Sequence, residues 1–254
     1  MTTSGSTDFN LEFTDIAEEA FERAGREMRS GYDLRTARRS MNLLTIEWAN
    51  RGINMWTIEQ GTKDLEQGTA TYDLPNDTID LLEHVIRTGA GNVSTQADLT
   101  LTRISVSTYA TIPNKLSQAR PIQIFISRNS GATYPATSAY SPGATAPPQF
   151  TVWPVPDQGT LASPYYQVIY WRLRRVQNAG EGLETPDMPF RFLPCITAGL
   201  AYYIAMKIPE GLPRLDMLKA AYEEQWNLAA GEDREKAAVR FVPRRMYLGN
   251  TGSF

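Results

Sequence analysis

The stretch from Asp33 to Val85 constrains the fold most, because within it a helical repeat of apolar residues stops and strand-like runs begin. The helical pattern ends at Arg51-Gly52, and a glycine directly after the last turn is a common helix stop. Short runs rich in β-branched and aromatic residues follow, separated by polar turns, as in a meander of strands. We therefore expect a helix, capped at its start by Asp33, that leads directly into a β region.

The helical part of this stretch has one apolar side and one polar side. Its apolar residues are spaced three and four apart, at Leu34, Ala37, Met41, Leu44 and Trp48. This spacing places them on one side of a helix and predicts close packing against another helix. The opposite side carries Arg35, Arg38, Arg39, Asn42 and Glu47.

Helical patterns also lie near both ends of the chain. One helix is predicted from about Asp15 to Met28, with Thr14 as its N-cap. The helical period returns near Pro189 and continues through Trp226. Each of these segments would expose an apolar stripe if it stood alone, so we expect them to pack together as one bundle.

The middle of the chain reads as strands. Candidate strands cover 54–60, 69–74, 79–87, 98–103, 121–127, 149–154 and 165–175, with a short helical turn within 102–111. Residues 129–148 are rich in Ser, Gly, Ala, Thr and Pro and predict a long surface loop.

The predicted fold class is therefore α+β. It consists of a helical bundle from N- and C-terminal helices, an inserted antiparallel β domain and an extended C-terminal arm. The expected division is a flexible N-terminal arm at 1–13, a bundle of 14–53 and 186–236, a β domain at 54–185 and a docking arm at 237–254.

Composition excludes several classes of protein. Apolar residues make up 42% and charged residues 21%, as in ordinary soluble domains, and a net charge of −3 gives no global basic field for nucleic acid. The longest apolar run, Ile196–Met206, is about half of the ~20 residues that span a bilayer, so we expect no membrane insertion. The first residues lack the features of a secretory signal.

Residues with catalytic or metal-binding chemistry are scarce. The single histidine, His84, lies in a strand-like run, and no Gly-x-Ser-x-Gly elbow supplies a nucleophile for it. The single cysteine, Cys195, is predicted to be a small buried core residue. One of each is too few for a zinc site, and Gly89-Ala90-Gly91 predicts a turn. We expect no catalytic residues, no metal, no cofactor and no enzymatic activity.

A carbohydrate-active enzyme or lectin-like binding protein is the alternative interpretation. Paired carboxylates could flank a sugar, and aromatic rings could stack on it. The residues concerned are Glu59, Asp64, Glu66 and Asp73, with Tyr134, Tyr140 and Trp153.

Basic residues and the tail indicate contact surfaces. Candidate channel or neighbour contacts are Arg35, Arg38, Arg39, Arg172 and Arg174. The tail mixes large apolar residues with arginines, which is typical of interface anchors, so we expect it to dock on a partner. The predicted docking residues are Arg240, Phe241, Val242, Pro243, Arg244, Arg245, Met246, Tyr247 and Leu248.

A series of fragments between Thr14 and Arg245 resembles a known family. In order they are Ala37–Leu44, Trp48–Trp56, Tyr72–Pro75, Ile112–Lys115, Arg120–Pro121, Pro189–Pro194 and Leu200–Ala205. They resemble the head-to-tail adaptor of short-tailed bacteriophages, also called the tail tubular protein A or packaged-DNA-stabilisation family.

The resemblance implies a structural virion protein of the phage neck, assembled in the host cytoplasm. Such adaptors form a ring of twelve copies between the portal and the tail nozzle or tail hub protein. The ring continues the DNA channel and helps retain the packaged double-stranded DNA through non-specific contact. The bundle and the C-terminal arm would dock on the portal, and the β region would face the nozzle. A neck or head-completion protein of a longer-tailed phage is a related alternative.

Overall fold

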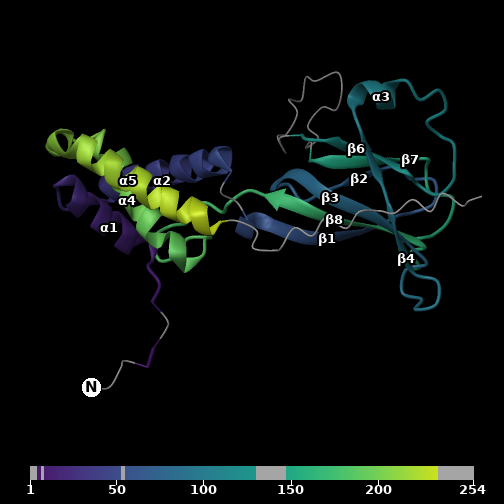
Figure 1. Ribbon diagram of the computed structural model, residues 1–254, viewed down its shortest axis with the longest axis horizontal. Coiled ribbons are helices and arrows are strands. Elements are labelled where there is room, and N and C mark those ends of the chain that lie inside the picture. The colour runs from purple at the N-terminus through teal and green to yellow at the C-terminus, as the bar shows by residue number, and fades with distance from the viewer. Residues whose placement is uncertain (1–4, 7–8, 53–54, 130–146, 234–254) are drawn as a thin grey trace, which may run out of the picture.

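The computed structural model describes residues 5–6, 9–52, 55–129 and 147–233, in which helices gather at one end and strands at the other (Figure 1). Helices from both ends of the chain form the bundle, and the strands between them form two sheets. The predicted α+β class is confirmed. The expected arm at 237–254 lies outside the described residues, and the exact division into domains stays a prediction.

Four helices build the bundle, and α4 packs against the other three. The helices are α1 (Phe13–Ala24), α2 (Gly31–Arg51), α4 (Leu193–Ala205) and α5 (Leu215–Glu232), with the 3-10 turns Met55–Thr57, Phe190–Phe192 and Pro209–Arg214. Helix α4 packs against α1, α2 and α5. It is apolar on nearly every side, which is the pattern of a helix that neighbours cover all round.

The predicted packing of the two helical blocks is confirmed. Ala37, Met41, Leu44 and Trp48 are buried in one cluster with residues of α4 and α5, and Leu34 packs at its edge. Across this core the Trp48 indole Nε1 donates a hydrogen bond to the Tyr222 hydroxyl at 3.0 Å. Helices α2 and α5 therefore meet side chain to side chain beside α4.

Two predicted helix starts are wrong. Helix α1 begins after Glu12, whose backbone and side chain form a capping box with Asp15, so Thr14 lies inside the helix. The second helix begins after Ser30, whose hydroxyl accepts from the Asp33 backbone N–H. Asp33 is instead a buried carboxylate.

Glycines end both helices. Gly25 adopts φ 96° and ends α1 at Ala24, four residues before the predicted end at Met28. Gly52 adopts φ 87° and ends α2 as predicted. Only glycine takes this left-handed conformation without strain from a Cβ.

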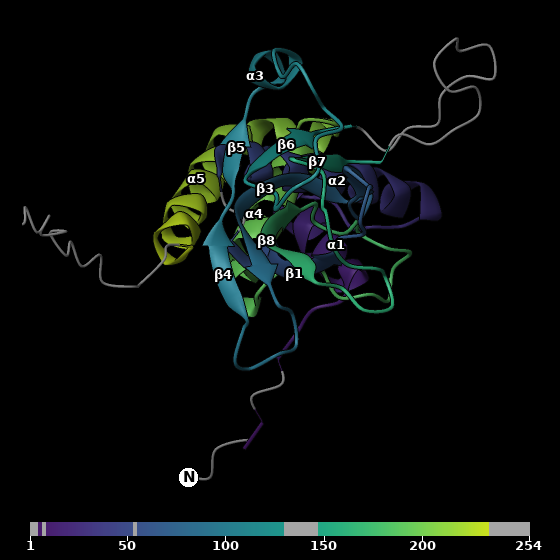
Figure 2. The ribbon, with the colours of Figure 1, turned by 90° about the vertical axis from the view of Figure 1, so that its right-hand side faces the viewer.

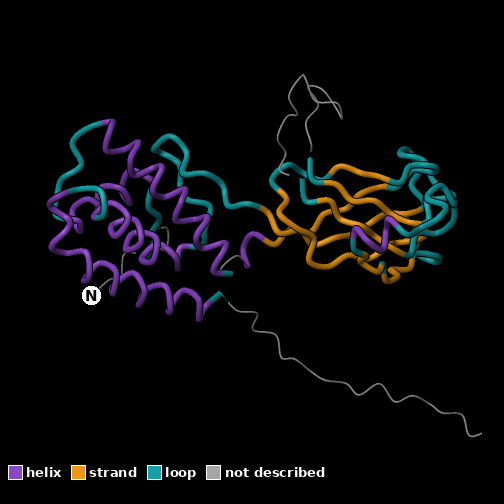
Figure 3. Tube along the Cα trace, turned by 90° about the horizontal axis from the view of Figure 1, so that it is seen from above, coloured by secondary structure: helices purple, strands orange, loops and turns teal. Residues whose placement is uncertain are grey.

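The β region contains two four-stranded sheets, seen as the orange strands of Figure 3. The strands are β1 (Ile58–Asp64), β2 (Thr71–Asp73), β3 (Thr78–Thr88), β4 (Ala97–Thr100), β5 (Thr102–Ile104), β6 (Gln123–Ser127), β7 (Gln149–Trp153) and β8 (Tyr166–Arg174). One sheet has the order β1-β8-β3-β4 and the other β2-β7-β6-β5. A second buried cluster, separate from that of the bundle, fills the space among these strands.

The prediction of one strand at 98–103 is wrong. This run is two strands, β4 and β5, which belong to different sheets. Buried Leu101 lies between them, where the chain passes from one sheet to the other. Each of the other predicted strands overlaps an observed one, and the helical turn expected within 102–111 is α3 (Val106–Ala110).

The predicted antiparallel character of the β region is confirmed, with one exception among the strand pairs. Strand β5 pairs with β6 in parallel, with Thr102 opposite Gln123 and Ile104 opposite Phe125. Between them the chain passes through α3 and a long connection, which returns it to the same end of the sheet. Parallel neighbours require such a crossover.

Candidate functional site

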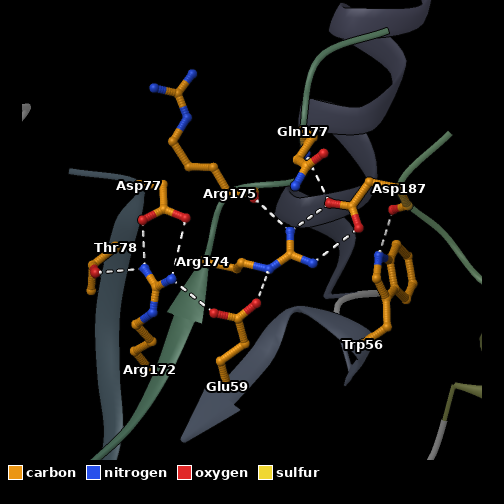
Figure 4. Close-up of polar contacts among 9 residues, drawn as sticks. All are labelled: Trp56, Glu59, Asp77, Thr78, Arg172, Arg174, Arg175, Gln177 and Asp187. Carbon is orange, nitrogen blue, oxygen red and sulfur yellow. Dashed lines mark hydrogen bonds and ion pairs between the residues drawn. The ribbon is translucent and has the colours of Figure 1, made fainter. Parts of the chain in front are cut away.

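The helices and the sheets are joined where two chain segments cross between them. One segment leads from α2 through Trp56 into β1, and the other leads from β8 through Asp187 to α4. The Trp56 indole Nε1 donates to the Asp187 backbone carbonyl at 2.8 Å, so the two crossings lie side by side (Figure 4). This junction is the candidate site, because any force between the two halves of the molecule passes through it.

Arg172 on β8 links the two strands that flank it. Its guanidinium donates to Glu59 on β1 at 2.8 Å, and to Asp77 and the Thr78 hydroxyl on the other side (Figure 4). Its side chain is only 12% exposed. Burial alone would lower the pKa of Arg172, but the hydrogen bonds to Asp77 and Glu59 raise it above the ordinary value.

Arg174 links the sheet to the segment that returns to the bundle. Its Nε donates to the same Glu59 carboxylate at 2.6 Å, and its Nη2 donates to Asp187 at 2.9 Å. Hydrogen bonding from Arg174 holds the pKa of the Asp187 carboxyl below its usual range. Asp187 also accepts from the Gln177 backbone N–H at 3.0 Å.

Together these contacts form a continuous ion-pair network, which we call the junction network: Glu59, Asp77, Arg172, Arg174 and Asp187. Glu59 bridges the two arginines. The structure thus brings together two of the arginines predicted as channel or neighbour contacts, and it shows them bonded within the chain. Their contact with a neighbour or with DNA stays a prediction.

A cleft of ≈ 700 Å³ lies beside the junction. On one side it is lined by α2, and on the other by the β2–β3 turn, the start of β3 and the chain after β8. The lining residues are Asn42, Thr45, Ile46, Ala49, Asn50, Asn76, Asp77, Ile79, Arg175, Val176, Gln177 and Asn178. Ile46 and Ile79 are exposed within it. Asp77 therefore belongs to both the cleft and the junction network.

The side of α2 that the spacing predicts to be polar is only partly exposed. Asn42 accepts from the Ala179 backbone N–H at 2.9 Å, and Glu47 pairs with Arg51. Arg38 is half-buried, and its Nε is buried without a hydrogen-bond partner among the described residues. Asn42 and Glu47 are therefore bonded within the protein, and Arg38 is only partly accessible.

Arg35 and Arg39, in contrast, are exposed. They share the outward side of α2 with the exposed apolar residues Leu43 and Ile46. The predicted polar side does not include these two residues. A helical wheel of the segment could have found this second apolar stripe, because it recurs at the same three- and four-residue spacing as the buried one.

The predicted docking residues Arg240–Leu248 lie outside the described residues, as do Tyr134 and Tyr140 of the carbohydrate hypothesis. The structure separates the carboxylates of that hypothesis. Glu59 belongs to the junction network on β1, whereas Asp73 lies on β2 in the other sheet and accepts from Gln149.

The remaining members of that group have local partners. Asp64 accepts from Gln167 at 2.7 Å, and the Trp153 indole Nε1 donates to the Asn114 carbonyl at 3.0 Å. The backbone N–H of Glu66 donates to the Tyr72 hydroxyl at 2.9 Å.

The two residues with the most reactive chemistry are both at least partly buried. Cys195 is buried in the bundle, as predicted, and burial raises its pKa to about 12, so the thiol stays protonated at neutral pH. His84 is half-buried on β3 opposite Tyr170, and burial followed by the charge of Arg103 lowers its pKa. In the described ranges no three His, Cys, Asp or Glu side chains gather as metal ligands, and no helix there is long and apolar enough to cross a membrane.

The described chain is an α+β protein in which a helical bundle is joined by the junction network to a two-sheet β region. The model of the SU10 adaptor protein family matches residues 13–246, so the chain belongs to that family. The members are phage head-tail adaptors, which confirms the resemblance read from the sequence and assigns the protein to the virion neck as a structural component. No curated protein matches the chain.

Proposed function

We propose that the chain forms a ring of twelve copies between the portal and the tail nozzle or tail hub protein. Membership of a head-tail adaptor family carries this proposal. The elongated build supports it, since the helices and the sheets lie at opposite ends and present separate surfaces (Figure 1). The protein acts in the neck without catalysis, after assembly in the host cytoplasm.

The portal-side contact uses the bundle together with the C-terminal arm, residues 237–254, and the β region faces the nozzle. Arg240–Leu248 combine aromatic, aliphatic and arginine side chains, the types that anchor interfaces. The last described helix, α5, ends at Glu232, and Asp233 after it accepts from the Met55 backbone N–H at 3.3 Å, so the described chain ends where the bundle meets the β region.

The ring continues the DNA channel and helps to retain the packaged DNA. Arg35, Arg38, Arg39, Arg172 and Arg174 are the candidate contacts to the channel or to a neighbour. Repetition of even one exposed arginine around a ring multiplies the local positive potential, and such contacts to phosphates need no base sequence. The exposed Arg35 and Arg39 fit this role best, because Arg172 and Arg174 are bonded within the junction network.

The test measures the mass of the purified chain alone and after mixing with portal rings from the same virion. We expect a complex with several adaptor copies per portal ring. A chain that ends at residue 236 should keep the circular dichroism spectrum of the full chain and lose portal binding. Unchanged portal binding by the truncated chain would contradict the docking arm, and the absence of any complex with the full chain would contradict the ring.

A further inference from the structure

Helix α2 has an outward face that is both apolar and basic. We call it the α2 face: Tyr32, Arg35, Arg39, Leu43, Ile46 and Asn50. These residues recur every three or four positions, opposite the buried Ala37, Leu44 and Trp48. Tyr32, Leu43 and Ile46 are each more than half exposed, and the face carries two arginines and no acidic residue.

Helix α5 has an outward face of the opposite charge. We call it the α5 face: Asp216, Met217, Ala220, Ala221, Glu224, Asn227, Leu228 and Gly231. It lies opposite the buried Leu218, Tyr222 and Trp226. Met217 and Leu228 are each more than half exposed, and the face carries two carboxylates and no basic residue.

Among the described residues the charges of the two faces meet no group of opposite charge, and the Arg35 Nε donates only to the Gly31 carbonyl of its own helix. In the part of the chain that the structure describes, no ion pair involves Arg35 or Arg39 on α2, or Asp216 or Glu224 on α5. Other charges close by are paired, as in Arg51 with Glu223. Each of the two faces therefore combines charges that have no ion-pair partner with exposed large apolar side chains.

The two faces point to different sides of the bundle. Both helices pack against α4, and Figure 2 shows α5 on the left of the bundle and α2 on its right. The two faces of one chain therefore cannot cover each other. Opposite faces of complementary charge on one subunit suit a head-to-tail contact between copies, and such contacts form a ring when the rotation from copy to copy closes.

From this arrangement we infer that the α2 face of one copy packs on the α5 face of the next. The exposed apolar residues of each face would be buried against the other, and the small Ala220, Ala221 and Gly231 would let the helices approach closely. Arg35 and Arg39 would meet Asp216 and Glu224, which fixes partner and orientation. This inference rests on the proposed ring and names the surfaces that close it.

Charge reversal in pairs tests the contact with full-length chains. Variant one carries Arg35→Glu and Arg39→Glu, and variant two carries Asp216→Lys and Glu224→Lys. Each variant alone places like charges face to face, so we expect its self-association to weaken by at least about tenfold. Self-association is measured on portal rings and, at high concentration, by sedimentation velocity. An equimolar mixture restores opposite charges at every contact, since copies alternate, and should assemble like the wild type.

Controls separate the possible failures. All four side chains are on outward faces, so both variants should melt at the same temperature as the wild type. The control variant Arg29→Glu changes an exposed ion pair outside both faces, so it should assemble normally. Normal assembly of either variant, or no recovery in the mixture, would overturn the inference while leaving the ring intact. Assembly that is unchanged by both reversals but is lost without residues 237–254 would mean that the tail makes the contact between copies. That result would also overturn the inference. A wild-type chain that never assembles would instead contradict the proposed ring.

Discussion

At the residue scale, Asp187 is the carboxylate on which the junction network depends. It forms an ion pair with Arg174 on the side of the junction that faces the bundle. The side chains of Arg174 and Asp187 are each less than a fifth exposed. Removing one partner of a buried pair leaves an uncompensated charge. We predict that Asp187→Ala lowers the free energy of unfolding by about 2–4 kcal/mol, below the upper end for such pairs because Glu59 still contacts Arg174.

Denaturant unfolding followed by circular dichroism measures this loss. The matched control is Asp98→Ala, which removes the acid of the more exposed Arg87–Asp98 pair on the β3–β4 hairpin. Solvent screens that pair, so its loss should be much smaller. Equal losses in the two variants would show that the junction network adds no more than a surface ion pair.

The same carboxylate should make stability depend on pH. Hydrogen bonding from Arg174 lowers the pKa of Asp187 in the folded state below its unfolded value of about 4. Its contribution is therefore fully present above that value and is lost as pH falls through the folded pKa. We predict that the difference in unfolding free energy between wild type and Asp187→Asn is constant from pH 5 to 7 and shrinks below about pH 4.

Unfolding curves at a series of pH values check this prediction. A difference that stays constant down to pH 3, with both proteins still folded, would mean that the charge of Asp187 adds nothing to its contacts.

The sequence identified the arginines of the junction but not their acidic partners. Arg172 and Arg174 are both predicted contact residues, and they lie two positions apart on one face of β8. Asp77 lies 95 positions from Arg172, and no local pattern joins residues so far apart. Asp187 is closer in the chain, yet it follows an irregular segment whose path depends on how the bundle and the sheets meet. Partners of this kind become visible only when the fold brings their segments together.

At the element scale, Gly199 sets how closely α4 approaches its neighbours. A Cβ at this position would lie 2.8 Å from side-chain carbons of both Leu44 on α2 and Tyr222 on α5. We predict that Gly199→Ala destabilises the protein by about 1–2 kcal/mol, because overpacking outweighs the ~1 kcal/mol by which alanine favours a helix. Thermal unfolding measures the change.

Gly231 provides the control on a helix surface. It lies in the last turn of α5, and a Cβ there meets nothing within 4 Å. Gly231→Ala should therefore leave stability unchanged or raise it slightly. If both substitutions stabilise the protein, close packing at Gly199 is not a constraint on the bundle.

Apolar spacing predicted the helices well and the strand connections poorly. Leu34 to Trp48 repeat over four turns, so the long pattern outweighs local ambiguity. The passage from β4 to β5 was missed because Leu101 continues the run of strand-forming residues, and a change of sheet alters no residue pattern. The parallel pairing of β5 with β6 depends on the path of the connection between them, which composition does not encode.

At the scale of the whole molecule, the bundle and the β region have separate buried clusters. The apolar stripes of the terminal helices predicted their common bundle, because neither block could bury its stripe alone. The two crossings between bundle and sheets lie together, since Ile58 at the start of β1 is the register partner of Leu173 near the end of β8. The β region is thus attached through one narrow pair of strands.

We predict that the bundle folds without the sheets. A chain in which residues 59–172 are replaced by a Gly-Ser-Gly-Ser turn joins two positions that already face each other, and it keeps the whole bundle core. It should show a helical circular dichroism spectrum and one cooperative melting transition. Leu44→Ala in this shortened chain should lower its stability by about 2–5 kcal/mol, as expected for a packed core position. A non-cooperative melt, or no response to Leu44→Ala, would mean that the bundle needs the β region to specify its packing, and that the adaptor is a single folding unit.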